Sequence, residues 1–239
     1  HSNIAHAVSK DGEKFKWDKK LAIVRKGKTE LRGVEDPRVT KIGDMYHMAF
    51  AAYDGKHVHL HTAISKDLNG PWKRQGEAVP QFNFSQSGGK MMKWKYGKPY
   101  EKKKSKRGIH WSKAGAFFSE KINGEYVIAF GEYFIWLAKS KDGKKFQVIN
   151  KPFLKPRKGT KYFDNTFIET GPPPILTEKG WLILYHGIDE AFRYQLGFVI
   201  TDKENPSKIL YRSRKPIFGP KEEYEIGDVL IDVVPGGTE

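Results

Sequence analysis

Residues 33–38, Gly-Val-Glu-Asp-Pro-Arg, set the carboxylates of Glu35 and Asp36 beside a proline and the guanidinium of Arg38. This spacing fits two interpretations. The charges can close a salt-bridged turn. Alternatively, a carboxyl group held next to a cation can transfer protons in an active site. The choice depends on which other residues the fold brings to Asp36.

A short unit recurs along the chain, and it predicts the fold. The copies read AVSKDGEKF at 7–15, AISKDLNGPW at 63–72 and AKSKDGKKF at 138–146, with a degenerate copy at 198–213. In each copy a strand would end in a tight turn, because Ser and Asp bond their own backbone and Gly tolerates positive φ.

Each of the last three copies follows a turn and an aromatic-led apolar strand, at 41–55, 121–133 and 177–189. Alternating polar and apolar residues dominate, and helical periodicity is nearly absent. The repeat therefore predicts an all-β fold of four-stranded sheets arranged around an axis, which is a β-propeller.

Aligning the repeated strands on their leading aromatic residues, Tyr46, Tyr126 and Trp181, predicts which side chains converge. Ten to thirteen residues earlier stand Glu35 and Asp36, Lys113 and Glu169; five to seven residues later stand Tyr53, Glu132 and His186. Equivalent strand ends of a propeller meet at one mouth of its central channel. We therefore expect these side chains to form one site.

Several segments carry a resemblance to a known family. They are GVEDPRVTKIGDMYHMAFAAYDG, FFSEKINGEYV, ETGPPPILTEKGWLILYHG and YRSRKPIFGPKEEYEIGDV, together with the repeated A-x-S-K-D strand ends. In these segments the chain resembles glycoside hydrolase family 130, in order and over nearly its whole length. The resemblance implies one five-bladed β-propeller catalytic domain over residues 1–239, with a basic insertion at about 88–110. Strands that close the fifth blade can lie outside this chain.

The resemblance also implies an enzyme that cleaves β-mannosides, with Asp36 as the proton donor. In the family this proton is relayed through a hydroxyl of the mannose ring, unlike the directly placed carboxyl pair of most glycosidases. Glu35 and Arg38 are then either substrate contacts or partners that fix Asp36. A purely structural Asp–Arg turn remains the alternative.

Departures from the family pattern indicate whether phosphate or water attacks the mannoside. Phosphorylases of the family usually carry an Arg after the strand that here reads YVIAFGEY and a Lys before the GPPP run, and these cations hold phosphate. Here the stretches read GE at 131–132 and FIE at 167–169. A pocket glutamate would repel phosphate and could deprotonate water, and crowding of carboxylates would raise its pKa.

These departures favour inverting hydrolysis of β-1,2-linked manno-oligosaccharides, with Glu169 as the base and Glu132 orienting water. The alternative is a phosphorylase that releases mannose 1-phosphate, which His186 favours because the YHG histidine is typical of phosphorylases. A hydrolase would be periplasmic or secreted, and a phosphorylase cytoplasmic. Either chemistry requires Asp36, Glu132 and Glu169 to lie well within about 15 Å of one another.

Other side chains have two interpretations each. Lys113 can contact sugar or a carboxylate. Asp164 and Tyr194 are expected to hydrogen-bond substrate, although Tyr194 equally suits packing within a blade. His57, His59 and His61 alternate along a strand (HVHLH) as metal ligands can, but no carboxylate or Cys completes a set nearby in the sequence. We therefore expect a polar outer strand face, and no metal or other cofactor.

Composition restricts the partners. The net charge of +15 suits an anionic partner, but the lysines spread along the whole chain, which favours a solvated surface. The cluster at 90–107 interleaves lysines with Trp94, Tyr96 and Tyr100, which could stack bases, form a sugar platform or sit in a solvated insertion.

Carboxylates at the channel mouth oppose nucleic-acid binding, and three of them exceed what a sugar-binding propeller without catalysis needs. No apolar run is long enough for a membrane helix. The substrate is the expected partner, and a homo-oligomer remains open.

Overall fold

The computed structural model of the protein describes residues 1–82, 110–222 and 225. Among these residues the only named helical element is the 3-10 turn η1 (Lys28–Glu30). The predicted all-β class is confirmed. The basic insertion at about 88–110, with its three aromatic residues Trp94, Tyr96 and Tyr100, lies outside the described residues except for His110.

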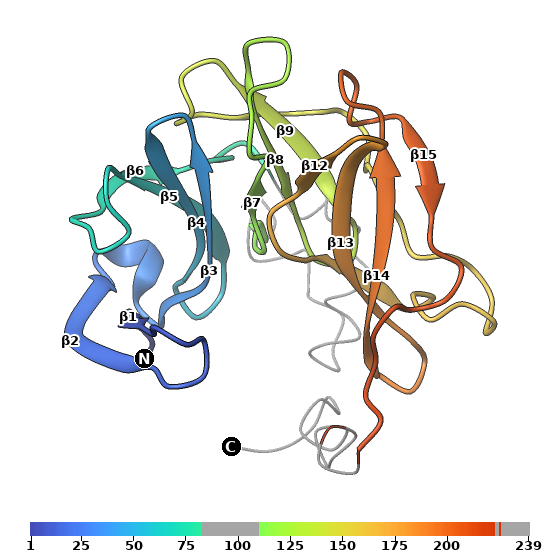
Figure 1. Cartoon of the computed structure of the whole chain (residues 1–239), viewed down its shortest axis with the longest axis horizontal. Coiled ribbons are helices and arrows are strands. Elements are labelled where there is room, and N and C mark those ends of the chain that lie inside the picture. Colours follow the sequence, from blue (N-terminus) through green and yellow to red (C-terminus); the bar gives the residue numbers. More distant parts are fainter. Residues whose placement is uncertain (83–109, 223–224, 226–239) are drawn as a thin grey trace, which may run out of the picture.

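Four antiparallel sheets follow one another along the chain, and none of them closes on itself (Figure 1). Their strand orders are β1-β2, β3-β4-β5-β6, β7-β8-β9-β10 and β11-β13-β14-β15, and β12 pairs with β13. The strands are β1 (Ile4–Val8), β2 (Lys16–Ile23), β3 (Gly33–Ile42), β4 (Met45–Tyr53), β5 (Val58–Ser65), β6 (Lys73–Glu77), β7 (Ala116–Phe117), β8 (Tyr126–Phe130), β9 (Trp136–Ser140), β10 (Gln147–Val148), β11 (Phe167–Thr170), β12 (Ile175–Thr177), β13 (Gly180–Ile188), β14 (Tyr194–Thr201) and β15 (Ile209–Arg212).

Each copy of the repeated unit forms a turn in which a Ser or Asp side chain accepts backbone N–H groups. After β1 the backbone N–H of Gly12 donates to the Ser9 hydroxyl, and after β9 that of Gly143 donates to the Ser140 hydroxyl, both over 2.9 Å. A related turn follows β5, and in the degenerate copy after β14 Asp202 accepts two backbone N–H groups. The turn therefore joins the last two strands of every sheet, as the repeat predicts.

The hydrophobic core lies between neighbouring sheets. Phe117 and Phe130 of the third sheet pack with Leu60 of the second, and Trp181 and Ile183 of the fourth pack in another cluster with residues of the third. β4 is buried along most of its length because its sheet is covered on both faces. Apolar burial between neighbouring sheets therefore holds them against each other.

The sheets stand side by side as blades do, with β7 against β3 and β4, and β11 against β8 (Figure 1). Each of the last three sheets repeats the antiparallel arrangement that the sequence predicts. A fifth blade is not among the described residues, so the five-bladed count stays a prediction.

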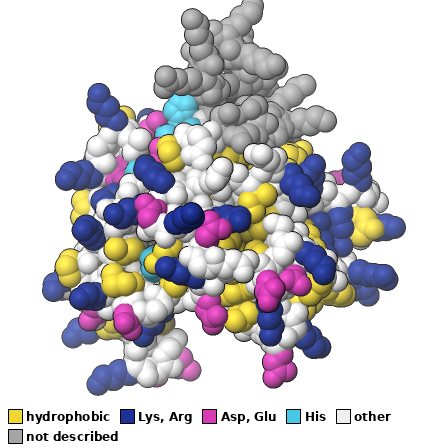
Figure 2. Space-filling view, turned by 90° about the horizontal axis from the view of Figure 1, so that it is seen from above, with side chains coloured by type: hydrophobic (Ala, Val, Ile, Leu, Met, Phe, Trp, Pro, Cys, Tyr) yellow, Lys and Arg dark blue, Asp and Glu magenta, His cyan; other side chains and the backbone are white. Residues whose placement is uncertain are grey.

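Charge is spread over the surface. Figure 2 shows Lys and Arg side chains scattered across the visible face, with Asp and Glu among them, and no single basic patch. This distribution supports the interpretation of the lysines as solvated surface. No helix in the described part of the chain has the length and hydrophobicity to cross a membrane.

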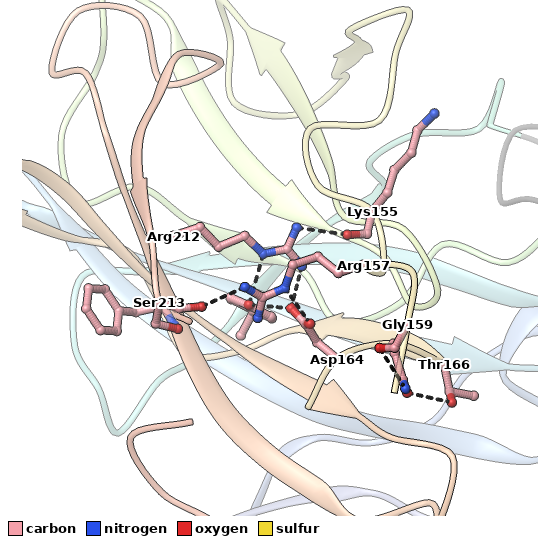
Figure 3. Close-up of polar contacts among 10 residues, drawn as sticks. Lys155, Arg157, Gly159, Asp164, Thr166, Arg212 and Ser213 are labelled. Atoms are coloured by element: carbon pink, nitrogen blue, oxygen red, sulfur yellow. Dashed lines mark hydrogen bonds and ion pairs between the residues drawn. The ribbon is translucent and has the colours of Figure 1, made fainter. Parts of the chain in front are cut away.

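Asp164 lies in a buried ionic cluster of the fourth sheet (Figure 3). Its oxygens accept hydrogen bonds from Arg157 Nε over 2.7 Å, from Tyr185 Oη over 2.7 Å and from Arg212 Nη2. Arg157 also donates to the carbonyl of Ser213. The Asp164 side chain is 0% exposed. It therefore has no surface with which to reach a sugar, contrary to the expected substrate contact, and it supplies the counter-charge that two guanidinium groups share instead.

Asp164→Asn should destabilise the protein by about 3 kcal/mol, because the amide keeps the shape but leaves two buried guanidinium groups without their counter-charge. Urea unfolding would measure the loss. Asp44→Asn, at the exposed turn between β3 and β4, is the matched control and should leave the midpoint close to that of the parent. Equal midpoints for both variants would contradict a structural role for Asp164.

Candidate active site

The ammonium group of Lys113 lies among three carboxylates that come from three different sheets or their connections. Its Nζ is 3.3 Å from Glu169 Oε1, 3.7 Å from Asp36 Oδ2 and 4.0 Å from Glu132 Oε1. Because each oxygen lies within 4.0 Å of Nζ, no two of them are more than twice that distance apart, well inside the expected limit of about 15 Å. We call these four residues the Lys113 cluster.

Asp36 is turned into the cluster by a β-bulge. The pairing of β3 with β4 shifts register between Glu35 and Arg38, and Asp36 has a φ of 54°. Asp tolerates this left-handed conformation better than most residues, and bulges commonly re-aim a side chain. The Asp36 side chain stays 38% exposed, so it can meet a ligand from solvent.

Arg38 holds the bulge against the fourth sheet. Its Nε donates to the carbonyl of Gly171 over 2.8 Å, its Nη2 to that of Thr170 over 3.0 Å and its Nη1 to that of Asp36 over 3.2 Å. All three guanidinium nitrogens are therefore engaged by backbone. Of the two predicted roles for Arg38, the geometry favours fixing Asp36.

Glu132 is fixed by backbone and by an indole. Trp111 Nε1 donates to Glu132 Oε2 over 2.7 Å, and Glu132 forms an isolated antiparallel bridge with Glu169. The preceding residue, Gly131, donates its N–H to the carbonyl of Lys113 over 2.8 Å. Gly131 has a φ of 119°, and a Cβ there would meet the carbonyl oxygen of Phe134 at 2.3 Å, so this link requires glycine.

The two glutamates of the cluster are buried more deeply than Asp36. The side chains of Glu132 and Glu169 are 4% and 10% exposed. Burial raises the pKa of Glu169, and the charge of Glu132 adds to this, while the ammonium of Lys113 offsets part of the shift. Burial opposes the charge of Lys113, but the three carboxylates outweigh it and raise the Lys113 pKa.

His186 and Tyr194 lie at the side of Glu169. His186 is the strand partner of Glu169, and its ring centroid is 6.1 Å from that of Tyr194. Burial and the nearby Arg38 lower the His186 pKa, and within the described residues its buried Nδ1 has no hydrogen-bond partner. Desolvation and the charges of Glu169 and Glu132 raise the Tyr194 pKa, although the side chain is about half exposed.

An open pocket of about 230 Å³ lies on the Asp36 side of the cluster. Glu35, Asp36, Tyr53, Trp111 and Lys113 are among the residues that line it. Aromatic faces beside a few convergent polar groups are typical of a small-molecule site. Glu35 and Tyr53 thus face the same space as Asp36, as the alignment of the strands predicts.

Comparisons with known proteins identify the family of the chain. The family model described as beta-1,4-mannooligosaccharide phosphorylase, that of glycoside hydrolase family 130, matches residues 1–238. The chain belongs to glycoside hydrolase family 130. The resemblance seen in the sequence is thereby confirmed.

Similar family 130 proteins are longer than this chain. It is 32% identical to a 1,2-beta-oligomannan phosphorylase of a Thermoanaerobacter species, over 98% of the chain and 69% of that protein. It is similar to the structure of the Listeria innocua beta-1,2-mannobiose phosphorylase with a TM-score of 0.71 and 31% identity, over 91% of the chain but 54% of that protein.

A third match comes from a study of glycoside hydrolases in family 130 that target beta-1,2 mannosidic linkages in Candida mannan. Its TM-score is 0.73 at 25% identity, with 93% of this chain and 64% of that one covered. The chain thus spans between about half and about two thirds of the length of these relatives.

Two features of the site were not predicted from the amino-acid sequence. Trp111 has no predicted site role, although an indole N–H in a buried place must find an acceptor, and Glu132 is that acceptor. The carbonyls of Thr170 and Gly171 that hold Arg38 are backbone groups, which leave no signal in residue types.

Glu169→Gln should make the protein more stable above about pH 5. The folded-state pKa of Glu169 lies above its ordinary value of 4.5, so the folded protein keeps a proton that the unfolded chain releases. The free energy of unfolding therefore falls as pH rises from 4.5 through the folded-state pKa, by about 1.4 kcal/mol for each unit between the two values. Gln does not ionise and removes this loss.

Thermal unfolding of parent and variant between pH 4 and pH 8 would measure the effect. The Tm difference should grow with pH and then level off. Glu178→Gln, in the exposed turn before β13, is the matched control and should give a difference that does not vary with pH. A Tm difference between variant and parent that stays constant or shrinks as pH rises would contradict a raised pKa.

Proposed function

We propose that this protein cleaves β-mannosidic bonds of manno-oligosaccharides, with Asp36 as the proton donor. The single observation that carries the proposal is the contact of Lys113 Nζ with Asp36, Glu132 and Glu169 beside one open pocket. A half-exposed carboxyl and a buried carboxylate pair on two sides of one ammonium suit an inverting displacement at a sugar carbon. The names of the relatives support β-1,2 linkages as the target.

Phosphate is the attacking group that the relatives support. Three curated relatives that align with 98% of the chain, at 31–32% identity, are named as phosphorylases of β-1,2-mannosides. In this reaction a phosphate oxygen attacks the anomeric carbon, the bond to the leaving sugar breaks, and the proton of Asp36 reaches the leaving oxygen. The products are mannose 1-phosphate and a shortened oligosaccharide. The preference for hydrolysis drawn from the sequence is not confirmed by these relatives.

Hydrolysis stays as the second candidate because of a specific observation. Three carboxylates surround the single ammonium of Lys113, and the guanidinium nitrogens of Arg38 donate to backbone carbonyls. With the carboxylates ionised, a phosphate dianion would meet net negative charge in a partly desolvated site. Water carries no such charge. Glu169 would then take the proton of the attacking water, and Glu132 would orient it.

Asp36→Asn should lower turnover of an unactivated β-mannoside by a factor of about 100 or more, because the amide keeps the shape but supplies no proton. Steady-state release of product from β-1,2-mannobiose measures it. Asp44→Asn, in the turn at the end of the same strand, is the matched control and should keep parental turnover. Near-parental turnover by folded Asp36→Asn would return Asp36 to the structural turn.

The reactant is identified by incubating the protein with β-1,2-mannobiose in the presence and absence of phosphate. Phosphorolysis predicts mannose 1-phosphate and a rate that depends on phosphate. Glu169→Gln should then keep activity and lower the KM for phosphate, because a negative charge is removed. Free mannose formed without phosphate, and lost by a factor of about 100 or more in Glu169→Gln, would instead establish hydrolysis with Glu169 as base.

A further inference from the structure

A second cluster of titratable side chains lies in the second sheet and the segment that follows it. Glu77 Oε1 is 2.9 Å from His59 Nδ1 and 3.0 Å from His110 Nε2. His59 is on β5, Glu77 ends β6, and His110 comes 33 positions later in the sequence. In the sequence no nearby carboxylate completes a set with the histidines of residues 57–61, but the fold brings Glu77 to His59. We call His59, Glu77 and His110 the histidine cluster.

The donor atoms of this cluster have the spacing of a metal site. One ligand atom from each residue lies within 4.8 Å of the other two. Tetrahedral Zn²⁺ with bonds of about 2.0–2.1 Å keeps its ligand atoms roughly 3.3 Å apart. The observed 2.9 Å and 3.0 Å to Glu77 Oε1 need a few tenths of an ångström of expansion, and the two nitrogens, which lie within 4.8 Å of each other, must take the same spacing to admit the ion. Two imidazoles and one carboxylate also match the preference of Zn²⁺ for nitrogen and oxygen ligands.

We propose that His59, Glu77 and His110 bind one Zn²⁺ ion, with a fourth position open to water or a further ligand. The carboxylate supplies negative charge to the ion, and the two side-chain nitrogens supply lone pairs.

Binding of the ion requires the ligands to rearrange. The rings of His59 and His110 stack with centroids 4.5 Å apart and planes 13° from parallel, so their in-plane lone pairs are nearly parallel and the rings must tilt toward each other to meet at one ion. Ser112 Oγ is 2.7 Å from His110 Nε2, the proposed ligand atom, and this contact must be given up to the ion. The side chains of His59 and His110 are 14% and 13% exposed, and the backbone N–H of His110 donates to His57 Nδ1 over 3.0 Å.

The proposed ion would sit behind the Lys113 cluster. Residues 110–113 run beside β5, with Val58 bonded to the carbonyl of His110 and to the N–H of Ser112. His110 belongs to the histidine cluster and Ser112 contacts it, whereas Trp111 and Lys113 contact the carboxylates of the candidate active site. Binding of Zn²⁺ would therefore restrain the segment that positions Lys113, and the ion has a structural role.

The competing explanation is a carboxylate that simply accepts hydrogen bonds from two imidazoles. Hydrogen bonds from His110 and His59 outweigh the burial of Glu77 and lower its pKa, which either explanation allows. The two explanations differ in one respect, because only a metal site takes up an ion in place of the protons between the ligands.

The test is titration of the chelator-treated full chain with ZnCl₂ in a calorimeter, with a chromophoric chelator as competitor. We expect one Zn²⁺ per chain and a rise in Tm on binding, and no uptake of Ca²⁺, which requires more oxygen ligands. His59→Gln and His110→Gln should each weaken Zn²⁺ binding by at least the 10–100-fold that even an outer-shell change causes. X-ray absorption of the loaded parent should report two imidazole ligands.

His61→Gln is the matched control, because His61 lies on the same face of β5 two residues from His59 and pairs with Glu30 at 3.4 Å instead. It should keep parental affinity. If His110→Gln fails to fold, Glu77→Gln replaces it with the same expected loss. Absence of zinc uptake, or equal affinity in His59→Gln and the parent, would overturn the proposal in favour of the hydrogen-bonded cluster. Neither result depends on whether the protein cleaves mannosides.

Discussion

The ammonium of Lys113 is the interaction on which the site depends. Asp36, Glu132 and Glu169 come from separate segments and would repel one another in a partly buried space without a cation between them. Removing the cation from such a buried set would leave three uncompensated carboxylates, which costs several kcal/mol. Lys113 therefore allows the strand ends of three sheets to lie close together. A charged ligand that enters the site changes the electrostatic interactions between Lys113 and the three carboxylates.

Backbone contacts hold the members of the Lys113 cluster in place. Gly131 bonds to the carbonyl of Lys113, Glu132 bridges to Glu169, and Arg38 ties the Asp36 bulge to the carbonyls of Thr170 and Gly171. These links join three sheets at the point where charge is concentrated. A side chain fixed in this way loses little freedom when a substrate binds, which is how pre-organised sites gain rate.

Much of this arrangement could be predicted from sequence, because a repeat carries its own register. The Ser-Lys-Asp turns mark strand ends, so counting from Tyr46, Tyr126 and Trp181 reached the members of the Lys113 cluster. Asp164 was misplaced because its partners Arg157 and Arg212 are 7 and 48 residues away and no repeat relates them. Contacts between unrelated segments, such as Glu77 with His110, also leave no periodic signal.

The choice between phosphate and water turns on how many charges the Lys113 cluster carries when a ligand arrives. If Glu169 is protonated, Lys113 faces two carboxylates, and a phosphate that displaces one of them from the ammonium meets less repulsion. If Glu169 is ionised, it would serve as the base of the proposed hydrolysis, with Asp36 as the acid. Under the proposed function, the protonation state of one buried carboxyl would thus select between the two reactions. Burial raises the pKa of Glu169, so changes in packing around it would shift this selection without touching Asp36.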